Sequence, residues 1–244
     1  MSIDPSAPLP PSPLDTWPPR WTPQAVVFDC DGMLVNTEAQ WVALQDEYLA
    51  RHGAAFDEET RRAITGRSIE VVIVAMAQLI GRDPHQVGAQ MMEAYRRSGG
   101  AEMVTMPGAY ETVRAVAAVR PVAVASNSPG EDLARKIKAL GLAEFVTAQV
   151  AVEDVASPKP APDMYAEAAR RLGADPAQCL AFEDSETGAE AALGAGMQLI
   201  AIPSLPGQEP RAPRRLSSLE DPDLAAWIAG WETAPAADGE VRTA

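Results

Sequence analysis

The sequence predicts an α/β fold in which a doubly wound parallel sheet carries a helical insertion after its first strand. From residue 106 onward, short apolar segments alternate with helical patterns, which is typical of parallel βαβ units. Before that region stands one strand-like segment, residues 26–28, followed by a block, residues 37–102, whose apolar positions recur three and four apart. That spacing is the period of a helix. A helical block inserted at this point should form a cap over the carboxyl edge of the sheet.

The first strand, residues 26–28, contains only β-branched and aromatic side chains, as expected of a strand covered on both faces. Glycines 53, 66 and 81 divide the helical block into about four helices. The later elements follow in order: a helix from 109, a strand over 122–126, a helix over 129–140, a weak strand near 146, a helix from 162, a strand over 179–183, a helix after 185, a strand over 199–202 and a terminal helix over 223–231.

These elements divide the chain into a core of residues 24–36 and 103–231 and a cap of residues 37–102. The first 23 residues carry eight prolines without apolar periodicity, so we expect residues 1–23 to be an extended or disordered lead. Residues 232–244 follow the last helix and are expected to form a loose tail.

The composition excludes several classes of protein. A chain of 244 residues with 47% hydrophobic content can bury a sizeable core. Its net charge of −14 would repel a nucleic-acid backbone. There is no apolar stretch of the roughly 18 residues that span a bilayer, and no export signal. Two cysteines, Cys30 and Cys179, make no disulfide framework. We expect a cytoplasmic monomer with no nucleic-acid or membrane partner.

Two aspartates follow the first strand, where open α/β sheets bind ligands. Asp29 and Asp31 are one residue apart, so strand alternation points both carboxylates into one crevice. Two like charges this close are unfavourable unless a cation or a shared proton compensates them. An Asp-Gly turn is the ordinary structural alternative.

Three later segments bring more polar groups to the same edge. Ser126 and Asn127 lead into a helix whose N-terminus offers backbone N–H groups to an anion. Lys159 lies between two prolines, and Glu183 and Asp184 follow a strand. Taken singly, each has an ordinary structural explanation: Ser126 as a helix cap, Lys159 as a surface cation, and the pair Glu183-Asp184 as an acidic helix start. Together they suggest one site.

The combination suits phosphoryl transfer without a nucleotide cofactor. A carboxylate can attack phosphorus to form an aspartyl-phosphate, and Mg²⁺, a lysine and hydroxyl donors can hold the phosphate charge. The chain has three lysines and two histidines, and both histidines lie in the helical block. Asp31 is therefore the group placed for proton transfer. The candidate Mg²⁺ ligands are Asp29, Asp31, Glu183 and Asp184.

The chain resembles haloacid dehalogenase superfamily hydrolases with a small helical cap over nearly its whole length, residues 25–231. Four motifs of that family match in order: a strand followed by DxDG at Asp29-Cys30-Asp31-Gly32, a strand-ending Ser or Thr at Ser126, a lysine often followed by proline at Lys159-Pro160, and a paired acidic motif at Glu183-Asp184.

The resemblance implies a role for each motif. Asp29 would be the nucleophile and would share the metal, and Asp31 would be the general acid and base. Ser126 and Lys159 would bind phosphate, while Glu183 and Asp184 would be Mg²⁺ ligands or their supports. The implied activity is a phosphatase acting on a small phosphorylated metabolite such as a sugar phosphate.

Other activities within the family differ at particular residues. Dehalogenases that attack carbon lack the second aspartate, Asp31, and phosphonatases need a cap lysine, which residues 37–102 do not contain. A β-phosphoglucomutase-like enzyme carries a cap histidine near the position of Trp41, and its cap-loop arginine is displaced here to Arg67. A hydrolase is favoured, with a mutase or a non-catalytic metabolite-binding protein as alternatives.

The substrate itself is left open by the sequence. Because the cap covers the leaving group, we expect residues of the cap loops to determine which leaving groups the enzyme accepts. Arg67 is a candidate for a bidentate contact with a carboxylate or hydroxyls of the substrate. Phosphatases of sugar phosphates, of phosphorylated sugar acids or alcohols, and of phosphoglycolate all fit the cap.

Overall fold

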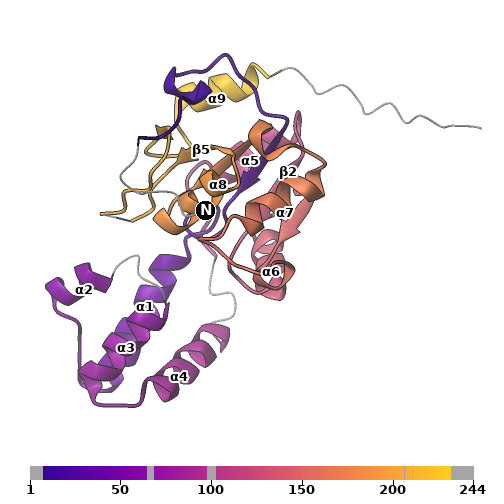
Figure 1. Ribbon diagram of the computed structural model, residues 1–244. Helices are drawn as coiled ribbons and strands as arrows, with labels where there is room; N and C mark the ends of the chain where they lie inside the picture. The colour runs from indigo at the N-terminus through magenta and orange to yellow at the C-terminus, as the bar shows by residue number, and fades with distance from the viewer. Residues whose placement is uncertain (1–7, 65–68, 98–102, 206, 232–244) are drawn as a thin grey trace, which may run out of the picture.

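The computed structural model describes residues 8–64, 69–97, 103–205 and 207–231. The chain forms an α/β core with a lobe of four helices at one end (Figure 1). The core holds a sheet of six parallel strands in the order β3-β2-β1-β4-β5-β6. The strands are β1 (Ala25–Phe28), β2 (Val122–Ala125), β3 (Ala148–Val150), β4 (Cys179–Glu183), β5 (Gln198–Ala201) and β6 (Arg214–Arg215).

The predicted doubly wound parallel sheet is confirmed. Strand β3 begins two residues after the predicted position, and the two-residue strand β6 was not predicted, because neither stretch is long or apolar enough to show the period of a strand. No helix in the described ranges is both long and apolar enough to cross a membrane.

Helices cover both faces of the sheet. Alternation along β1 sends Val26 and Phe28 to one face and Ala25 and Val27 to the other. One face packs against α5 (Ala109–Ala117), α6 (Gly130–Ala139) and α9 (Pro222–Ala229). The opposite face packs against α7 (Asp163–Leu172) and α8 (Glu186–Gly194). Both faces of the central strands are therefore buried, which is why their sequences are almost wholly apolar.

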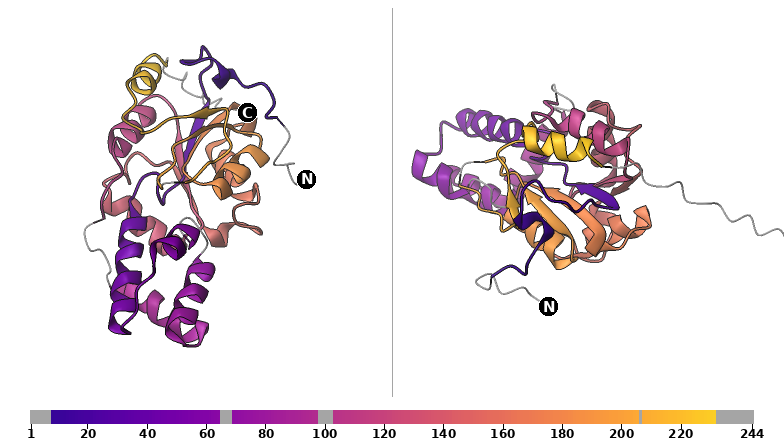
Figure 2. Two further views of the ribbon diagram at one scale, coloured as in Figure 1. Left: turned by 90° about the vertical axis from the view of Figure 1, so that its left-hand side faces the viewer. Right: turned by 90° about the horizontal axis from the view of Figure 1, so that it is seen from above.

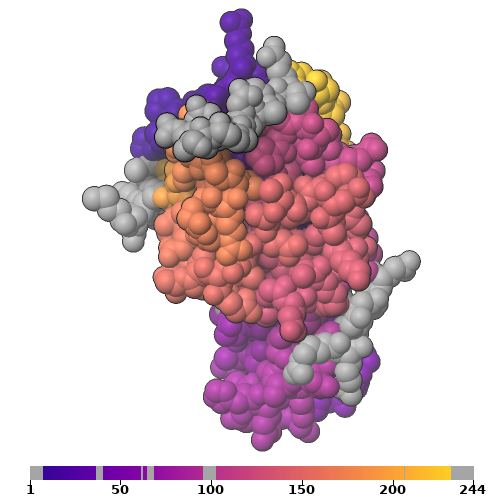
Figure 3. Space-filling model, turned by 90° about the vertical axis from the view of Figure 1, so that its right-hand side faces the viewer, coloured from indigo at the N-terminus to yellow at the C-terminus, as the bar shows by residue number. Residues whose placement is uncertain are grey.

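The four-helix lobe comprises α1 (Thr37–Arg51), α2 (Glu58–Ile64), α3 (Ile69–Ile80) and α4 (Pro84–Arg97). It has its own buried cluster, which includes Leu49, Met76 and Met91. The views in Figure 2 place it beyond one end of the core, and the space-filling view shows it directly against the core surface (Figure 3). We call this lobe the cap.

Two chain segments that lie side by side join the cap to the core. The N–H of Asn36 donates to the carbonyl of Val104 over 2.8 Å, and the N–H of Met106 donates to the carbonyl of Leu34 over 3.0 Å. Because the first of these segments begins immediately after β1, the cap leaves the core at the carboxyl edge of the sheet. This connection holds the cap over the strand ends that carry the predicted site.

The proline-rich N-terminal segment, expected to be extended or disordered, is described from residue 8 onward. Residues 8–23 pack on the core: Leu14 is fully buried, its carbonyl accepts from Arg214 over 2.9 Å, and the Trp17 ring lies 5.5 Å from that of Trp227 in α9. Tryptophan and leucine spaced among the prolines supply apolar area that proline content alone does not reveal. Residues 232–244, predicted as a loose tail, lie outside the described residues.

This packing predicts that a single leucine in the N-terminal segment stabilises the core. Leu14→Ala should lower the free energy of unfolding by about 2–5 kcal/mol, since it empties a fully buried site. Urea titration followed by tryptophan fluorescence measures the change as a shifted midpoint. Leu9→Ala, at a half-buried position of the same segment, is the matched control and should cost less than about 1 kcal/mol. Equal effects of the two changes would contradict the packing described here.

Candidate active site

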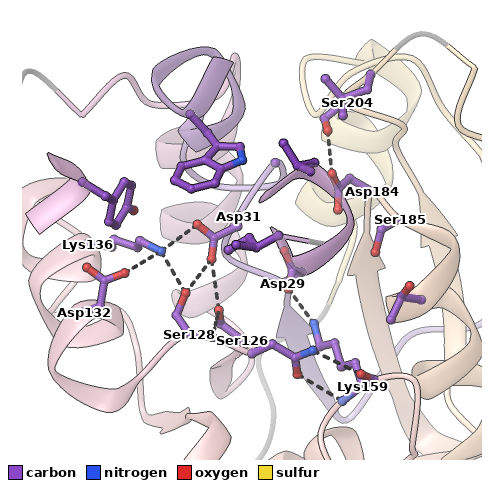
Figure 4. Close-up of a pocket in the computed structure, with 18 of the residues that line it drawn as sticks. Asp29, Asp31, Ser126, Ser128, Asp132, Lys136, Lys159, Asp184, Ser185 and Ser204 are labelled. Carbon is purple, nitrogen blue, oxygen red and sulfur yellow. Dashed lines mark hydrogen bonds and ion pairs between the residues drawn. The ribbon is translucent and has the colours of Figure 1, made fainter. Parts of the chain in front are cut away.

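The predicted site residues meet at the carboxyl edge of the sheet. Asp29 and Asp31 follow β1, Ser126 and Asn127 follow β2, Lys159 precedes α7, and Glu183 and Asp184 close β4. All of them line one cavity of about 990 Å³ between the core and the cap. Figure 4 shows most of these side chains, with Asp29 and Asp31 turned toward different partners. Arg67 lies outside the described residues.

Lys159 joins three strand ends at the floor of the cavity. Its Nζ lies 2.5 Å from Asp29 Oδ1 and 2.6 Å from Glu183 Oε1, and it donates to the carbonyl of Ala125 over 3.0 Å. Burial lowers the pKa of Lys159, but the carboxylates of Asp29 and Glu183 outweigh burial and raise it well above its usual value. The ammonium therefore stays charged and compensates both acids.

Asp29 is the carboxylate at the centre of this arrangement. Burial raises the pKa of Asp29 well above its usual value, and the Lys159 ammonium opposes that rise without cancelling it, because Glu183 and Asp184 add further negative charge. A buried acid surrounded by other acids gains from any additional cation. The electrostatic field at Asp29 therefore favours a metal ion or another positive group.

Glu183 has all its hydrogen-bonding capacity used inside the protein. Its Oε1 accepts from Lys159 and, over 2.8 Å, from the Tyr165 hydroxyl, while Oε2 accepts from the N–H groups of Asp184 and Ser185 and from the Ser185 hydroxyl. A Cβ at Gly188 would lie 1.7 Å from Glu183 Oε1. Glycine at that position lets the first turn of α8 approach the carboxylate. Glu183 thus fixes Lys159 and the start of α8 together.

Asp184 faces the cavity beside Glu183. Its Oδ2 accepts from the Ser204 hydroxyl over 2.5 Å. A Cβ at Gly32, which has φ +87°, would lie 2.0 Å from that oxygen, so the turn after β1 needs glycine for both conformation and space. Burial, followed by the charge of Glu183, raises the pKa of Asp184 to about 7. Such a carboxyl is under-compensated by the protein alone.

The donor set fits a divalent cation. Carboxylate oxygens of Asp29, Glu183 and Asp184 all lie within 4.8 Å of one another, and hard cations such as Mg²⁺ take oxygen ligands. A cation at this point would offset the burial and the Glu183 charge that raise the pKa of Asp184. The structure does not bring the Asp31 carboxylate into this group.

Asp31 instead makes a second polar cluster on the other side of the cavity. Its Oδ1 lies 2.7 Å from Lys136 Nζ, and its Oδ2 accepts from the hydroxyls of Ser126 over 3.1 Å and Ser128 over 3.0 Å (Figure 4). A cation and two hydroxyl donors favour the ionised carboxylate. The predicted proton-transfer group and the predicted phosphate-binding serine are therefore in direct contact.

Lys136 is the residue that sequence analysis missed. It is 2% exposed, and its Nζ also lies 2.8 Å from Asp132 Oδ2 and 2.9 Å from the Ser128 hydroxyl. Burial lowers the pKa of Lys136, but Asp31, together with smaller contributions from Cys30, Tyr95 and Asp132, raises it, so the net direction is upward. A signal existed: Lys136 shares the buried face of α6 with Leu133 and Ile137, and a lysine in an apolar stripe is unusual.

Asn127 uses its side chain to hold a loop. Its Nδ2 donates to the carbonyl of Lys159 over 3.2 Å, and its Oδ1 accepts from the N–H of Lys159 over 3.0 Å. The predicted phosphate-binding side chain is thus engaged with the backbone of Lys159. Its effect in the structure is to position that lysine.

The cap supplies a different kind of surface to the cavity. The rings of Trp41 and Tyr95 meet edge to face with centroids 6.1 Å apart, and both line the cavity. Gln45 Oε1 accepts from Arg61 over 3.3 Å, and Arg61 also forms an ion pair with Asp46. The cap side of the cavity is therefore mainly apolar, opposite a charged floor.

Comparison with known proteins identifies similar hydrolases. Residues 23–196 match the family model described as haloacid dehalogenase-like hydrolase. The chain is 34% identical over 212 residues to the bifunctional riboflavin kinase/FMN phosphatase of Arabidopsis thaliana, covering 83% of this chain and 55% of that protein. It is 30% identical over 179 residues to the fructose-1-phosphate phosphatase of Escherichia coli (strain K12), covering 72% of this chain and 95% of that protein. The chain thus spans about half the length of the first relative and nearly all of the second.

Solved structures of similar chains share the fold. One is a HAD family hydrolase from Deinococcus radiodurans R1 with bound phosphate and sodium, at 31% identity and a TM-score of 0.68, covering 85% of this chain and 96% of that chain. Another is CbbY from Rhodobacter sphaeroides in complex with phosphate, at 27% identity and a TM-score of 0.62, covering 82% and 96%.

The raised pKa of Asp184 predicts how the stability of the metal-free protein depends on pH. The folded state holds a proton on Asp184 up to about pH 7, whereas the unfolded chain releases it near the usual value of 3.8. The stabilising contribution is therefore complete below pH 3.8 and is lost as the pH rises through about 7. The side chain in Asp184→Asn resembles the protonated acid. Between about pH 5 and 8, the free energy of unfolding of this variant should therefore rise relative to that of the wild type by on the order of 2 kcal/mol.

Denaturant titrations in the presence of a chelator, at about pH 5 and at about pH 8, measure this difference. Asp223→Asn, at an exposed position of α9, is the control, and its free energy of unfolding should equal that of the wild type at both pH values. An Asp184→Asn advantage that does not grow with pH would show that Asp184 is ionised in the metal-free fold.

Proposed function

Because this chain belongs to the haloacid dehalogenase-like hydrolase family, we propose that it is a phosphoric monoester hydrolase. Its proposed substrate is a small phosphorylated metabolite, a sugar phosphate or similar phosphomonoester, hydrolysed with Mg²⁺ and through an aspartyl-phosphate on Asp29. One observation carries the mechanism: Asp29 lies 2.5 Å from Lys159 within a group of three acids, at the floor of a cavity closed on the opposite side by the cap.

The first step is attack by an Asp29 carboxylate oxygen on the phosphorus of the substrate. The new O–P bond forms as the bond from phosphorus to the leaving oxygen breaks, which gives an aspartyl-phosphate and an alcohol. Lys159 offsets the charge of the nucleophile, and Tyr165 and Glu183 hold Lys159 in place from behind. The nucleophile is therefore fixed before substrate arrives.

The phosphoryl oxygens need donors on the open side of Asp29. Ser126 and Lys159 line the same cavity as Asp29 and are the proposed phosphate-binding side chains, with backbone N–H groups around Asn127 as further donors. Asp29 and Asp184 would hold Mg²⁺, with Glu183 supporting them. Bound there, Mg²⁺ would offset the negative charge that substrate and nucleophile bring together.

Asp31 is the proposed proton-transfer group. In the first step its carboxyl proton would pass to the leaving oxygen, and in the second its carboxylate would take a proton from the water that attacks the aspartyl-phosphate. The second step releases phosphate and restores Asp29. Lys136 and two serine hydroxyls favour the carboxylate form that accepts the proton, whereas the charge of a bound phosphomonoester favours the protonated form.

The function is tested by phosphate release from a panel of phosphorylated metabolites. With Mg²⁺ present, wild-type protein should release free phosphate, and thorough chelation should remove nearly all turnover, because the acidic group then lacks its cation. Asp29→Asn should lower turnover by about 10³ or more, since it removes the nucleophile. Product analysis separates a phosphatase from a mutase, which would return an isomeric phosphate ester. Full activity in the chelator, or in Asp29→Asn, would refute the mechanism.

The second cluster predicts that two lysines of one helix differ in importance. Asp31→Asn should lower kcat by about 10² or more, as expected on loss of a general acid and base. Lys136→Met, which removes the cation that orients Asp31, should lower kcat by about tenfold with little change in KM. Lys138→Met, exposed on the same helix α6, should match the wild type. Equal kinetics of the Lys136 and Lys138 variants would mean that Lys136 serves folding alone.

A further inference from the structure

We propose that the leaving group of the substrate is aromatic or heteroaromatic and packs against the apolar side of the cap. This inference rests on the proposed function, because it concerns the part of the substrate that the core does not bind. The surface in question, here named the cap wall, belongs to the described cap residues that line the cavity: Trp41, Val42, Ile64, Ile69, Val72, Met92 and Tyr95.

The cap wall draws apolar side chains from all four cap helices. Among the described cap residues that line the cavity, seven are apolar or aromatic and two, Gln45 and Arg61, are polar. Ile69 is 44% exposed and Met92 is 38% exposed. Large apolar side chains left open to solvent inside a binding cavity mark a surface that a ligand covers.

The two polar cap residues already have partners. Gln45 is 2% exposed and accepts from Arg61, whose guanidinium also pairs with Asp46 and lies 5.2 Å from the centroid of the Phe56 ring. A polyol leaving group would bring several hydroxyls, each of which costs free energy when buried without a hydrogen-bond partner. The described cap wall is poor in such partners.

An aromatic leaving group would pack favourably on the same surface. Trp41 and Tyr95 offer ring faces and edges to an aromatic ligand, and the aliphatic members of the cap wall gain from covering any flat apolar surface. The cavity of about 990 Å³ lies at the upper end of the range for small-molecule sites. It has room for a ring system as well as a phosphate.

Charge fixes the orientation of such a substrate. Lys159 and Lys136, both buried, lie at the core side of the cavity. The one charged residue among the described cap residues that line the cavity, Arg61, is paired with Asp46. A molecule with an anionic phosphate at one end and an aromatic body at the other therefore has one favourable orientation. In it, the phosphate lies next to Asp29 and the body lies beneath the cap.

The experiment compares benzyl phosphate, fructose 1-phosphate and acetyl phosphate as substrates of the Mg²⁺-loaded wild-type enzyme. Benzyl phosphate is an ester of a primary alcohol, as fructose 1-phosphate is, but its leaving group is an aromatic ring without further hydroxyls. The inference predicts a kcat/KM for benzyl phosphate at least about tenfold above that for fructose 1-phosphate. Trp41→Ala should lower kcat/KM for benzyl phosphate about tenfold more than for acetyl phosphate, mainly through KM. Leu79→Ala, exposed on α3 and absent from the cavity lining, should leave all three values unchanged.

A second variant guards against misfolding, since Trp41 also packs on the buried cluster of the cap. Met92→Gln keeps the length of an exposed side chain and should lower the preference for benzyl phosphate over fructose 1-phosphate. A wild-type preference for fructose 1-phosphate that neither variant alters would overturn the inference while leaving the phosphatase intact. Absence of hydrolysis of all three compounds, acetyl phosphate included, would overturn the proposed function and this inference with it.

Discussion

The ion pair between Lys159 and two carboxylates is the constraint on which the rest of the site depends. Asp29 and Glu183 are both buried and lie at the ends of neighbouring strands, so each would be costly without the ammonium between them. Several other residues hold the members of this ion pair in position. Asn127 clamps the backbone of Lys159, Tyr165 donates to Glu183, and Gly188 allows α8 to close over the same carboxylate. Removing the lysine would therefore disturb three strand ends and not one charge alone.

A second ion pair gives the site its two-sided character. Asp31 is only two residues from Asp29, yet it pairs with Lys136 and two serines, while Asp29 pairs with Lys159. Cys30, between the two aspartates, is fully buried in the core on the α5, α6 and α9 side. Each aspartate thus has its own cation, which lets two carboxylates share one cavity while holding different surroundings. That separation is what distinct roles as nucleophile and proton carrier require.

Much of the core could be predicted from sequence because its signals are local. Apolar strands such as Val122–Ala125 and Cys179–Glu183 alternate with amphipathic helices, and the rule that parallel strands end at one edge brings Asp29, Ser126, Lys159 and Glu183 together before any coordinates are known. The helical block after β1 was equally readable from its period of three and four. Short elements such as β6, and the packing of Leu14 among prolines, carry no periodic signal and were not predicted.

The sequence by itself determined which chemical groups this protein brings to one place, since residue order, strand alternation and parallel topology suffice for that. Only the tertiary structure decided what each group contacts. Lys136 comes from a helix face 105 residues from Asp31, Asn127 turns its amide to a loop, and the cap aromatics face the charged floor across a cavity. Such pairings depend on how packed helices are rotated and on which side chains fill the space between them, and both are settled by the burial of the whole core and not by any local pattern.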